Sequence, residues 1–136
     1  VRSVAMQTLG KLAPEALAAH AAAVVGKLEH SDAGVRRVAI QTLGKLAPEA
    51  LAAHSAAVVG KLEDSDAGVR RAASETLGKL APEALAAHAP AVVGKLEDSQ
   101  NYVRKAAATT LRKLEPAVLE AQGQAAVAKL NEVERE

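Results

Sequence analysis

Apolar side chains follow a helical spacing along the segment 35–46. They lie at i, i+4, i+7, i+8 and i+11, together with one threonine, at Val35, Ala39, Thr42, Leu43 and Leu46. Because this spacing puts them on one stripe, it predicts an amphipathic helix. Just upstream, Asp32 and Ser31 are the two candidates for the N-cap of that helix.

A second helical segment is predicted after a break at Ala47-Pro48-Glu49. Proline is tolerated at a first helical position, and glutamate suits the positive N-terminus of a helix. The apolar pattern then continues at Leu51, Val58, Val59 and Leu62. Because a proline deep inside a helix costs about 3 kcal/mol, Pro90 indicates that this segment bends near His54 and at its equivalents. We predict a short helical turn from Pro82 and a new helix from about Ala89.

The pattern of two helices recurs four times with a period of 34 residues, which accounts for all 136 residues. The units are 1–34, 35–68, 69–102 and 103–136. A fixed period of this size is typical of a solenoid, in which each unit buries its apolar face only against its neighbours. We therefore predict an all-α fold, an α-solenoid of stacked antiparallel helical hairpins that forms one domain over residues 1–136.

Glycines recur at two places in the unit and are replaced in its last copy. They are Gly10, Gly44 and Gly78 in the first helix, and Gly26, Gly60 and Gly94 in the second. Inside a helix, glycine costs about 1 kcal/mol relative to alanine, so we expect the first set to permit close approach of the adjoining helix. Arg112 and Ala128 take these places in the last unit, which also gains many polar residues. We expect residues 103–136 to form a C-terminal cap with a polar outer face.

The first helix of the chain lacks the helix that precedes its equivalents. Val1, Ala5 and Leu9 are therefore expected to be partly uncovered, which favours self-association through this N-terminal helix. The alternative is an end that frays without consequence. Because the sequence starts in the middle of a unit and without Met, we expect a processed, excised or engineered piece.

Composition narrows the possible functions. Apolar residues make up 49% of the chain, but Tyr102 is its only aromatic residue, so Leu, Val and Ala must build the core. Seventeen basic and sixteen acidic residues give a net charge of +1, which argues against nucleic acid as a partner. No apolar run reaches the roughly 18 residues of a membrane span. The absence of cysteine and of a signal-peptide pattern fits a cytoplasmic protein.

The run Val58 to Leu80 resembles a known repeat. It reads Val-Val-Gly-Lys-Leu-Glu-Asp-Ser-Asp-Ala-Gly-Val-Arg-Arg-Ala-Ala-Ser-Glu-Thr-Leu-Gly-Lys-Leu, and it is similar to a HEAT repeat of the short phycobilin-lyase type and to the artificial alpha-helicoidal repeat proteins built from that type. It departs from them in the longer Pro-Glu-Ala-Leu-Ala-Ala-His connection. The resemblance implies a right-handed α-solenoid whose second helices line a concave protein-binding surface. The near identity of the units is typical of design or of recent duplication.

Positions that differ between the units gather on one face of the Val-Arg helix and on the turn before it. The candidate strip consists of Arg37, Val38, Gln41, Lys45, Arg71, Ala72, Glu75, Lys79, Asn101, Tyr102, Lys105 and Thr109. One interpretation is a partner-binding face with Tyr102 as its rigid anchor. The other is a solvated face whose residues vary without functional consequence.

Histidine and arginine also recur once per unit. A metal site shared by His20, His54 and His88 is not expected, because neighbouring helices pack about 8–10 Å apart and two ligands of one zinc ion lie only about 3–4 Å apart. Arg36 and Arg70 each follow an aspartate by four residues, which predicts i,i+4 ion pairs that could extend between units as a ladder. For these arginines, a role in structural support is favoured over a role in anion binding. The replacement of that aspartate by Gln100 in the last unit is expected to remove one rung.

No arrangement of residues predicts catalysis or a cofactor. The chain has no Cys nucleophile, no Gly-rich phosphate loop and no Ser with a convergent His and Asp. The leading hypothesis is a non-enzymatic protein-interaction scaffold, either a fragment of a natural array or a designed repeat protein. The alternative is a structural or self-assembling module without a dedicated partner. An enzyme or metal protein is a third hypothesis.

Overall fold

The computed structural model describes residues 19–136, and within this range every regular element is a helix. The elements in chain order are α3 (Ala21–Gly26), η1 (Lys27–Glu29), α4 (Ala33–Leu43), α5 (Pro48–Ala53), α6 (Ser55–Gly60), η2 (Lys61–Glu63), α7 (Ala67–Leu77), α8 (Pro82–Ala87), α9 (Ala89–Gly94), η3 (Lys95–Glu97), α10 (Asn101–Leu111), α11 (Pro116–Glu120) and α12 (Gln124–Glu134). The all-α, solenoid-like arrangement of stacked helix pairs is therefore confirmed. Val1, Ala5 and Leu9, on which the expected self-association rests, lie outside the described residues.

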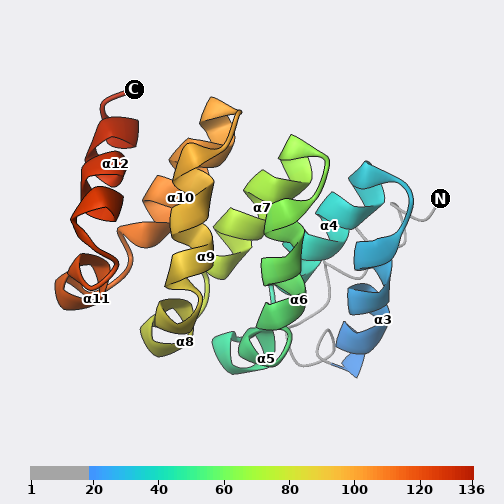
Figure 1. Ribbon diagram of the computed structural model, residues 1–136. Helices are drawn as coiled ribbons and strands as arrows, with labels where there is room; N and C mark the ends of the chain where they lie inside the picture. The colour runs from blue at the N-terminus through green and yellow to red at the C-terminus, as the bar shows by residue number, and fades with distance from the viewer. Residues whose placement is uncertain (1–18) are drawn as a thin grey trace.

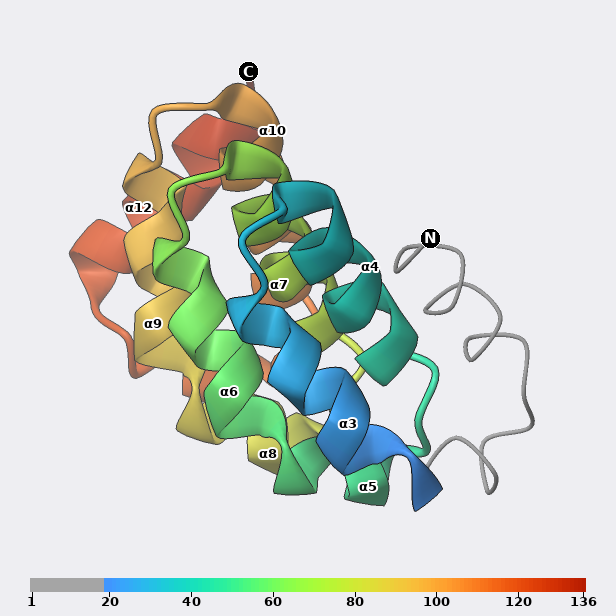
Figure 2. The same cartoon turned by 90° about the vertical axis from the view of Figure 1, so that its right-hand side faces the viewer.

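The helices form two layers (Figure 1). The inner layer consists of α4, α7 and α10, and the outer layer consists of α3, α6, α9 and α12. The short helices α5, α8 and α11 connect the two layers and lie along one edge of the array (Figures 1 and 2). Consecutive inner helices contact one another extensively, whereas consecutive outer helices make few contacts. The inner helices thus lie closer together, which places the first helix of each unit on the concave side of the array. The family resemblance implied the second helix of each unit at this place, and that expectation is wrong.

The local signals in the sequence position the helix ends. The Asp32 carboxylate accepts hydrogen bonds from the backbone N–H groups of Gly34 (2.7 Å) and Val35 (3.3 Å), so Asp32 rather than Ser31 is the N-cap of α4. The predicted bend is confirmed, since α8 begins at Pro82 and α9 begins at Ala89. In the last unit the break between α11 and α12 falls at Gly123, whose φ of 105° favours glycine.

Aliphatic side chains from both layers form one continuous core. The five positions of the predicted stripe are all buried, and Leu43 and Leu77 are each only 1% exposed. Leu51, Leu62, Leu85 and Leu96 reach the same core from the outer layer and the connecting helices. A hairpin therefore shelters its leucines against the hairpins on either side, as the 34-residue period predicts.

A ladder of arginine–aspartate pairs links successive units, but its partners differ from those predicted. Arg36 donates to both carboxylate oxygens of Asp64 at 2.9 and 3.0 Å, and Arg70 binds Asp98 in the same way at 2.8 and 3.1 Å. Asp32 and Asp66 had been expected as partners, and that prediction is wrong because their carboxylates cap helices instead. Each arginine also donates to a backbone carbonyl in the turn before its own helix.

The predicted loss of a rung in the last unit is also wrong. Arg104 pairs with Glu136, with Nη2 and Oε1 3.0 Å apart, so the ladder continues past Gln100 with a different acid. A second ladder runs along the outer layer, where Lys61 pairs with Glu29 and Lys95 with Glu63. Both ladders join side chains about one repeat apart, so they fix the register of neighbouring units. The glutamates of the second ladder are exposed, and such pairs add little stability, whereas the side chains of Asp64 and Asp98 in the first ladder are largely buried.

The glycines differ in what surrounds them. Gly44 and Gly78 follow the last residues of α4 and α7 rather than lying inside these helices, which corrects the predicted position. The predicted close approach is confirmed, because a Cβ on Gly78 would lie 3.0 Å from Lys113 Nζ and 3.2 Å from Thr110 Oγ1. A Cβ on Gly60 or Gly94 would meet nothing within 4 Å. Of the described glycines in these two sets, packing therefore requires only Gly44 and Gly78. Gly10 lies outside the described residues.

We expect Gly94→Ala to raise the free energy of unfolding by about 0.5–1 kcal/mol, because it restricts the unfolded chain and meets no atom in the folded one. Gly78→Ala should give no gain or a loss, because its Cβ would press on Thr110, whose hydroxyl is hydrogen-bonded to Ser74. Urea titrations of the two variants measure this difference. Equal gains at both positions would contradict the role assigned to Gly78.

The ladder also predicts a dependence of stability on pH. Burial by itself would raise the pKa of Asp98, but the hydrogen bonds from Arg70 and from the Gln100 N–H, with the charge of Arg70, hold that pKa below its ordinary value of 3.8. A depressed carboxylate pKa stabilises the folded state above pH 4, and this contribution is lost as pH falls through the lowered pKa.

Asp98→Asn should therefore lower the free energy of unfolding at pH 7 by about 1.5–3 kcal/mol, and the difference from the unmodified chain should shrink below about pH 4. Glu136→Gln, in a more exposed rung, is the matched control and should change stability little. Denaturant titrations between pH 2 and 7 test both. A deficit for Asp98→Asn that persists unchanged at pH 2 would show that the ion pair is not its cause.

Candidate functional site

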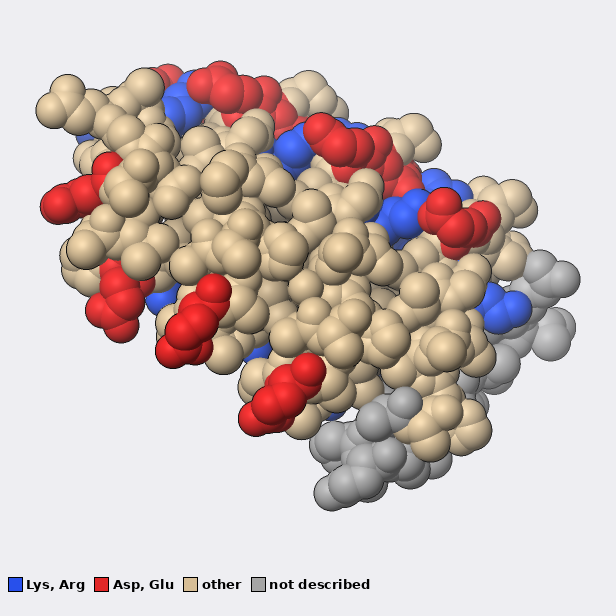
Figure 3. Space-filling view, turned by 60° about the horizontal axis from the view of Figure 1, so that its bottom comes forward, with Lys and Arg blue, Asp and Glu red and all other residues tan. Residues whose placement is uncertain are grey.

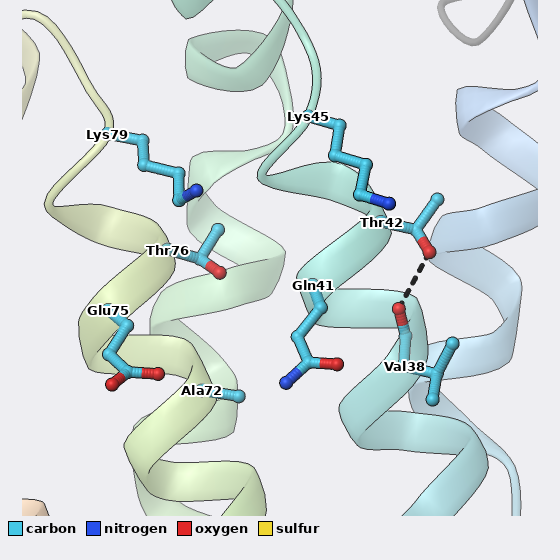
Figure 4. A pocket seen from close by; sticks show the side chains of 8 residues that line it. All are labelled: Val38, Gln41, Thr42, Lys45, Ala72, Glu75, Thr76 and Lys79. Atoms are coloured by element: carbon cyan, nitrogen blue, oxygen red, sulfur yellow. Dashed lines mark hydrogen bonds between the residues drawn. The ribbon is translucent and has the colours of Figure 1, made fainter. Parts of the chain in front are cut away.

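A groove lies between α4 and α7 on the inner layer (Figure 4). It encloses about 540 Å³ and is lined by Val38, Gln41, Thr42, Lys45, Ala72, Glu75, Thr76 and Lys79. A second groove of about 560 Å³ lies between α7 and α10 and is lined by Arg71, Glu75, Lys79, Tyr102, Lys105, Ala106, Thr109, Thr110 and Lys113. Because Glu75 and Lys79 line both grooves, the two grooves form one continuous surface across α4, α7 and α10. We call this surface, with all the lining residues of both grooves, the inner groove.

Threonines that recur in every unit form the floor of the inner groove. Thr42, Thr76 and Thr110 are all buried. Thr42 donates to the Val38 carbonyl of its own helix at 2.8 Å, as Figure 4 shows. Thr76 and Thr110 instead donate across to the preceding inner helix, to the carbonyls of Ile40 (3.4 Å) and Ser74 (2.8 Å). These hydrogen bonds join neighbouring inner helices and so help to set the distance between them at the floor of the groove.

Longer polar side chains form the walls and rim. Lys45 and Lys79 extend from the ends of neighbouring helices, and Gln41 and Glu75 lie further along the same two helices (Figure 4). Lys113 occupies the equivalent place after α10, where its Nζ donates to the Gly78 carbonyl at 3.2 Å. The ammonium group has three donors, so this contact does not exhaust it.

Tyr102 is the one large apolar side chain among residues 19–136 that is exposed, at 40%. It stands at the start of α10, where the preceding units have Gly34 and Gly68. The guanidinium carbon of Arg71 lies 6.0 Å from the centroid of the tyrosine ring, and Arg71 also pairs with Glu75 at 3.2 Å. A contact across the ring orients the phenol at the edge of the inner groove.

The structure brings together ten of the twelve residues of the candidate strip. Val38, Gln41, Lys45, Arg71, Ala72, Glu75, Lys79, Tyr102, Lys105 and Thr109 all line the inner groove. Arg37 and Asn101 are exposed but do not line it. The comparison of units missed the floor threonines because these residues are the same in every unit, so a search for variable positions could not find them. It also left out Lys113, although the equivalent Lys45 and Lys79 were included.

The recurring histidines lie apart from the inner groove. His88 Nε2 lies 3.0 Å from the hydroxyl of Ser55 in the preceding unit. His30, which does not recur, accepts a hydrogen bond at Nδ1 from the Asp32 N–H. Among residues 19–136 there is no group of three or more His, Cys, Asp or Glu side chains placed to hold a metal ion. In the same part of the chain, no helix has the length and apolar character needed to cross a membrane.

Residues 22–111 match the family model for HEAT repeats, and the chain belongs to this family. Solved structures share its fold. One is an engineered protein, with a TM-score of 0.71 and 18% sequence identity, and the match covers 97% of this chain and 61% of that one. Another is the complex of CpcE and CpcF of phycocyanin lyase from Nostoc sp. PCC7120, with a TM-score of 0.60 and 20% identity, and the match covers 96% of this chain and 98% of that one. A designed armadillo repeat protein is also similar, with a TM-score of 0.61 and 20% identity, and the match covers 97% of this chain and 63% of that one.

At these identities the likeness is one of fold. This chain spans somewhat less than two thirds of the length of both the engineered protein and the designed armadillo protein. A comparison with curated proteins gave no match. HEAT repeats are helical arrays that commonly mediate protein interactions, and this is the functional class to which the fold points.

We expect Thr110→Val to lower the free energy of unfolding by about 1 kcal/mol, because the substitution keeps the shape of the side chain but removes its hydrogen bond to Ser74. Thr109→Val, one residue away and exposed, is the control and should stay within about 0.5 kcal/mol. Thermal unfolding followed by circular dichroism measures both. Equal stability of the two variants would show that the bond between helices does not support the floor.

Proposed function

We propose that this protein is a non-enzymatic interaction scaffold that binds a protein partner in the inner groove. The observation that carries the proposal is that ten residues of the candidate strip, eight of them at positions that differ between the units, meet on one continuous surface across α4, α7 and α10. Residues that pack the core are nearly the same in every unit, whereas most of the side chains on the walls and rim of the groove differ between units. Such a division is what a binding surface requires, since specificity needs side chains that vary while the stack needs side chains that do not.

The physical character of the inner groove supports protein recognition. It combines small buried residues on the floor, a half-buried valine, and a rim of long polar side chains around a single tyrosine. Tyrosine and arginine are the residue types most enriched at the centre of protein interfaces. Tyr102 and Arg71 lie together at the edge of the groove, so they are its best candidates for anchors.

We also propose that residues 103–136 form a C-terminal cap. Arg112, at the place of the packing glycines, donates to Glu134 and Asn131 of α12 instead of leaving room for a further helix. The outward side of α12 and the end of α11 present mostly polar or small residues, Glu120, Gln124, Ala128 and Asn131, with one half-buried valine, Val127. Polar outer faces of this kind are what terminal repeats of solenoids need in water.

The experiment that tests the scaffold function compares two faces of one molecule. A tagged chain is used to isolate a partner, the partner is identified by mass spectrometry, and its affinity is then measured by calorimetry. The variant Arg71→Ala/Tyr102→Ala should weaken binding by about tenfold or more. The control Glu63→Ala/Glu83→Ala, on the outer side, should bind as the unmodified chain does.

Two results would contradict the proposal. If Arg71→Ala/Tyr102→Ala bound the partner as tightly as the unmodified chain does, the binding site would have to lie on another face. Concentration-dependent oligomers with no partner would favour the alternative, a self-assembling module whose ends are its active surfaces.

A further inference from the structure

The inner groove carries a local excess of positive charge. Five of its charged side chains are cations and one is a carboxylate, so its net charge is +4, whereas the whole chain carries +1. They are Lys45, Arg71, Lys79, Lys105, Lys113 and Glu75. On the outer side, by contrast, lysines and glutamates pair with one another between units, and Figure 3 shows acidic and basic groups side by side along one edge of that face.

Three of the cations repeat with the period of the array. Lys45, Lys79 and Lys113 each stand two residues after the last residue of α4, α7 and α10. All three are exposed and line the inner groove. Neighbouring packed helices lie about 8–10 Å apart, so the ammonium groups form a row with about that repeat.

An extended peptide can match this repeat. A polyproline II helix has three residues per turn and rises about 3.1 Å per residue, so every third side chain points the same way and recurs at about 9 Å. A β-strand does not match as well, because its side chains at i and i+3 point to opposite faces. Carboxylates at every third residue of a polyproline II segment would therefore each face one lysine of the row.

We propose that the inner groove binds an acidic, extended segment of a partner protein, in which Asp or Glu occupies every third residue. This inference rests on the proposed function and adds the chemistry of the partner. The segment crosses α4, α7 and α10, with its carboxylates on Lys45, Lys79 and Lys113. Its intervening residues lie over Val38 and the small side chains of the floor.

The structure also limits the length of this segment. The next groove, between α10 and α12, is lined by Glu134 and Glu136 as well as Lys105. Both carboxylates are already paired, Glu134 with Arg112 and Glu136 with Arg104. The positive surface thus ends at α10, and three carboxylates spread over seven residues fill it.

Single-stranded nucleic acid is a poorer occupant for the same surface. Binding of its bases relies on several aromatic side chains on which successive bases stack. Tyr102 is the only aromatic residue of the whole chain, so stacking could hold one base at most. Separate carboxylates fit the row of lysines without such stacking.

The test uses two peptides of identical composition. One is three repeats of Glu-Pro-Ala, and the other places the three glutamates next to one another. Calorimetry at low ionic strength should show the spaced peptide binding about tenfold more tightly, and rising salt should weaken it. Because the chain has no tryptophan and one tyrosine, the emission of Tyr102 reports directly on occupation of the groove.

Charge-reversal variants locate the peptide. Lys45→Glu/Lys79→Glu should weaken binding of the spaced peptide by about tenfold or more. Lys27→Glu/Arg135→Glu changes the net charge equally but outside the inner groove, and it should leave binding unchanged. Should the reversal variant unfold, as circular dichroism would reveal, Lys45→Gln/Lys79→Gln replaces it with the same expected direction.

Each contrary result has a distinct meaning. Equal affinity for the two acidic peptides, or binding of neither, would overturn the proposed spacing or the acidic partner. A neutral Gln-Pro-Ala peptide that bound equally well, and was lost with Tyr102→Ala, would overturn the acidic partner while leaving the scaffold function intact. Tighter binding of a single-stranded oligonucleotide than of the spaced peptide would identify nucleic acid as the occupant and overturn the inference.

Discussion

Close packing between consecutive inner helices is the constraint on which the rest of the structure depends. At the ends of α4 and α7, glycine lets the side chains of the next inner helix approach to distances that a Cβ would obstruct. Buried threonines then bond across the same contact. The outer helices touch one another much less. This difference between layers curves the array and creates the inner groove as a by-product of stacking.

Charged side chains serve two different roles, in the contacts between units and in the inner groove. Arginine–aspartate and lysine–glutamate pairs join neighbouring units, and each is oriented by backbone contacts or by the repeat itself. The exposed lysine–glutamate pairs add modest stability, but both kinds of pair oppose slippage of one hairpin against the next because they join neighbouring units at fixed places. The cations that line the inner groove outnumber its carboxylates by five to one, which leaves a surface suited to a partner of opposite charge.

Much of the fold followed from local rules in the sequence. The period of 34 residues, the apolar stripe with Leu43 and Leu46, the N-cap at Asp32 and the new helix at Ala89 depend on neighbours in the chain, and each appears as expected. Ten of the candidate residues line one groove because equivalent positions on one face of a repeated helix come together once the helices stack.

What the sequence alone determined was therefore the unit: its helices, its breaks and the face that has to be buried. Only the tertiary structure decided which side chains meet between units. Arg36 has an aspartate four residues before it, yet it binds Asp64, because Asp32 is already engaged by the backbone at the helix start. Thr110 and Lys113 are identical to their equivalents, and their place in the groove became visible only when the distance between α7 and α10 was known.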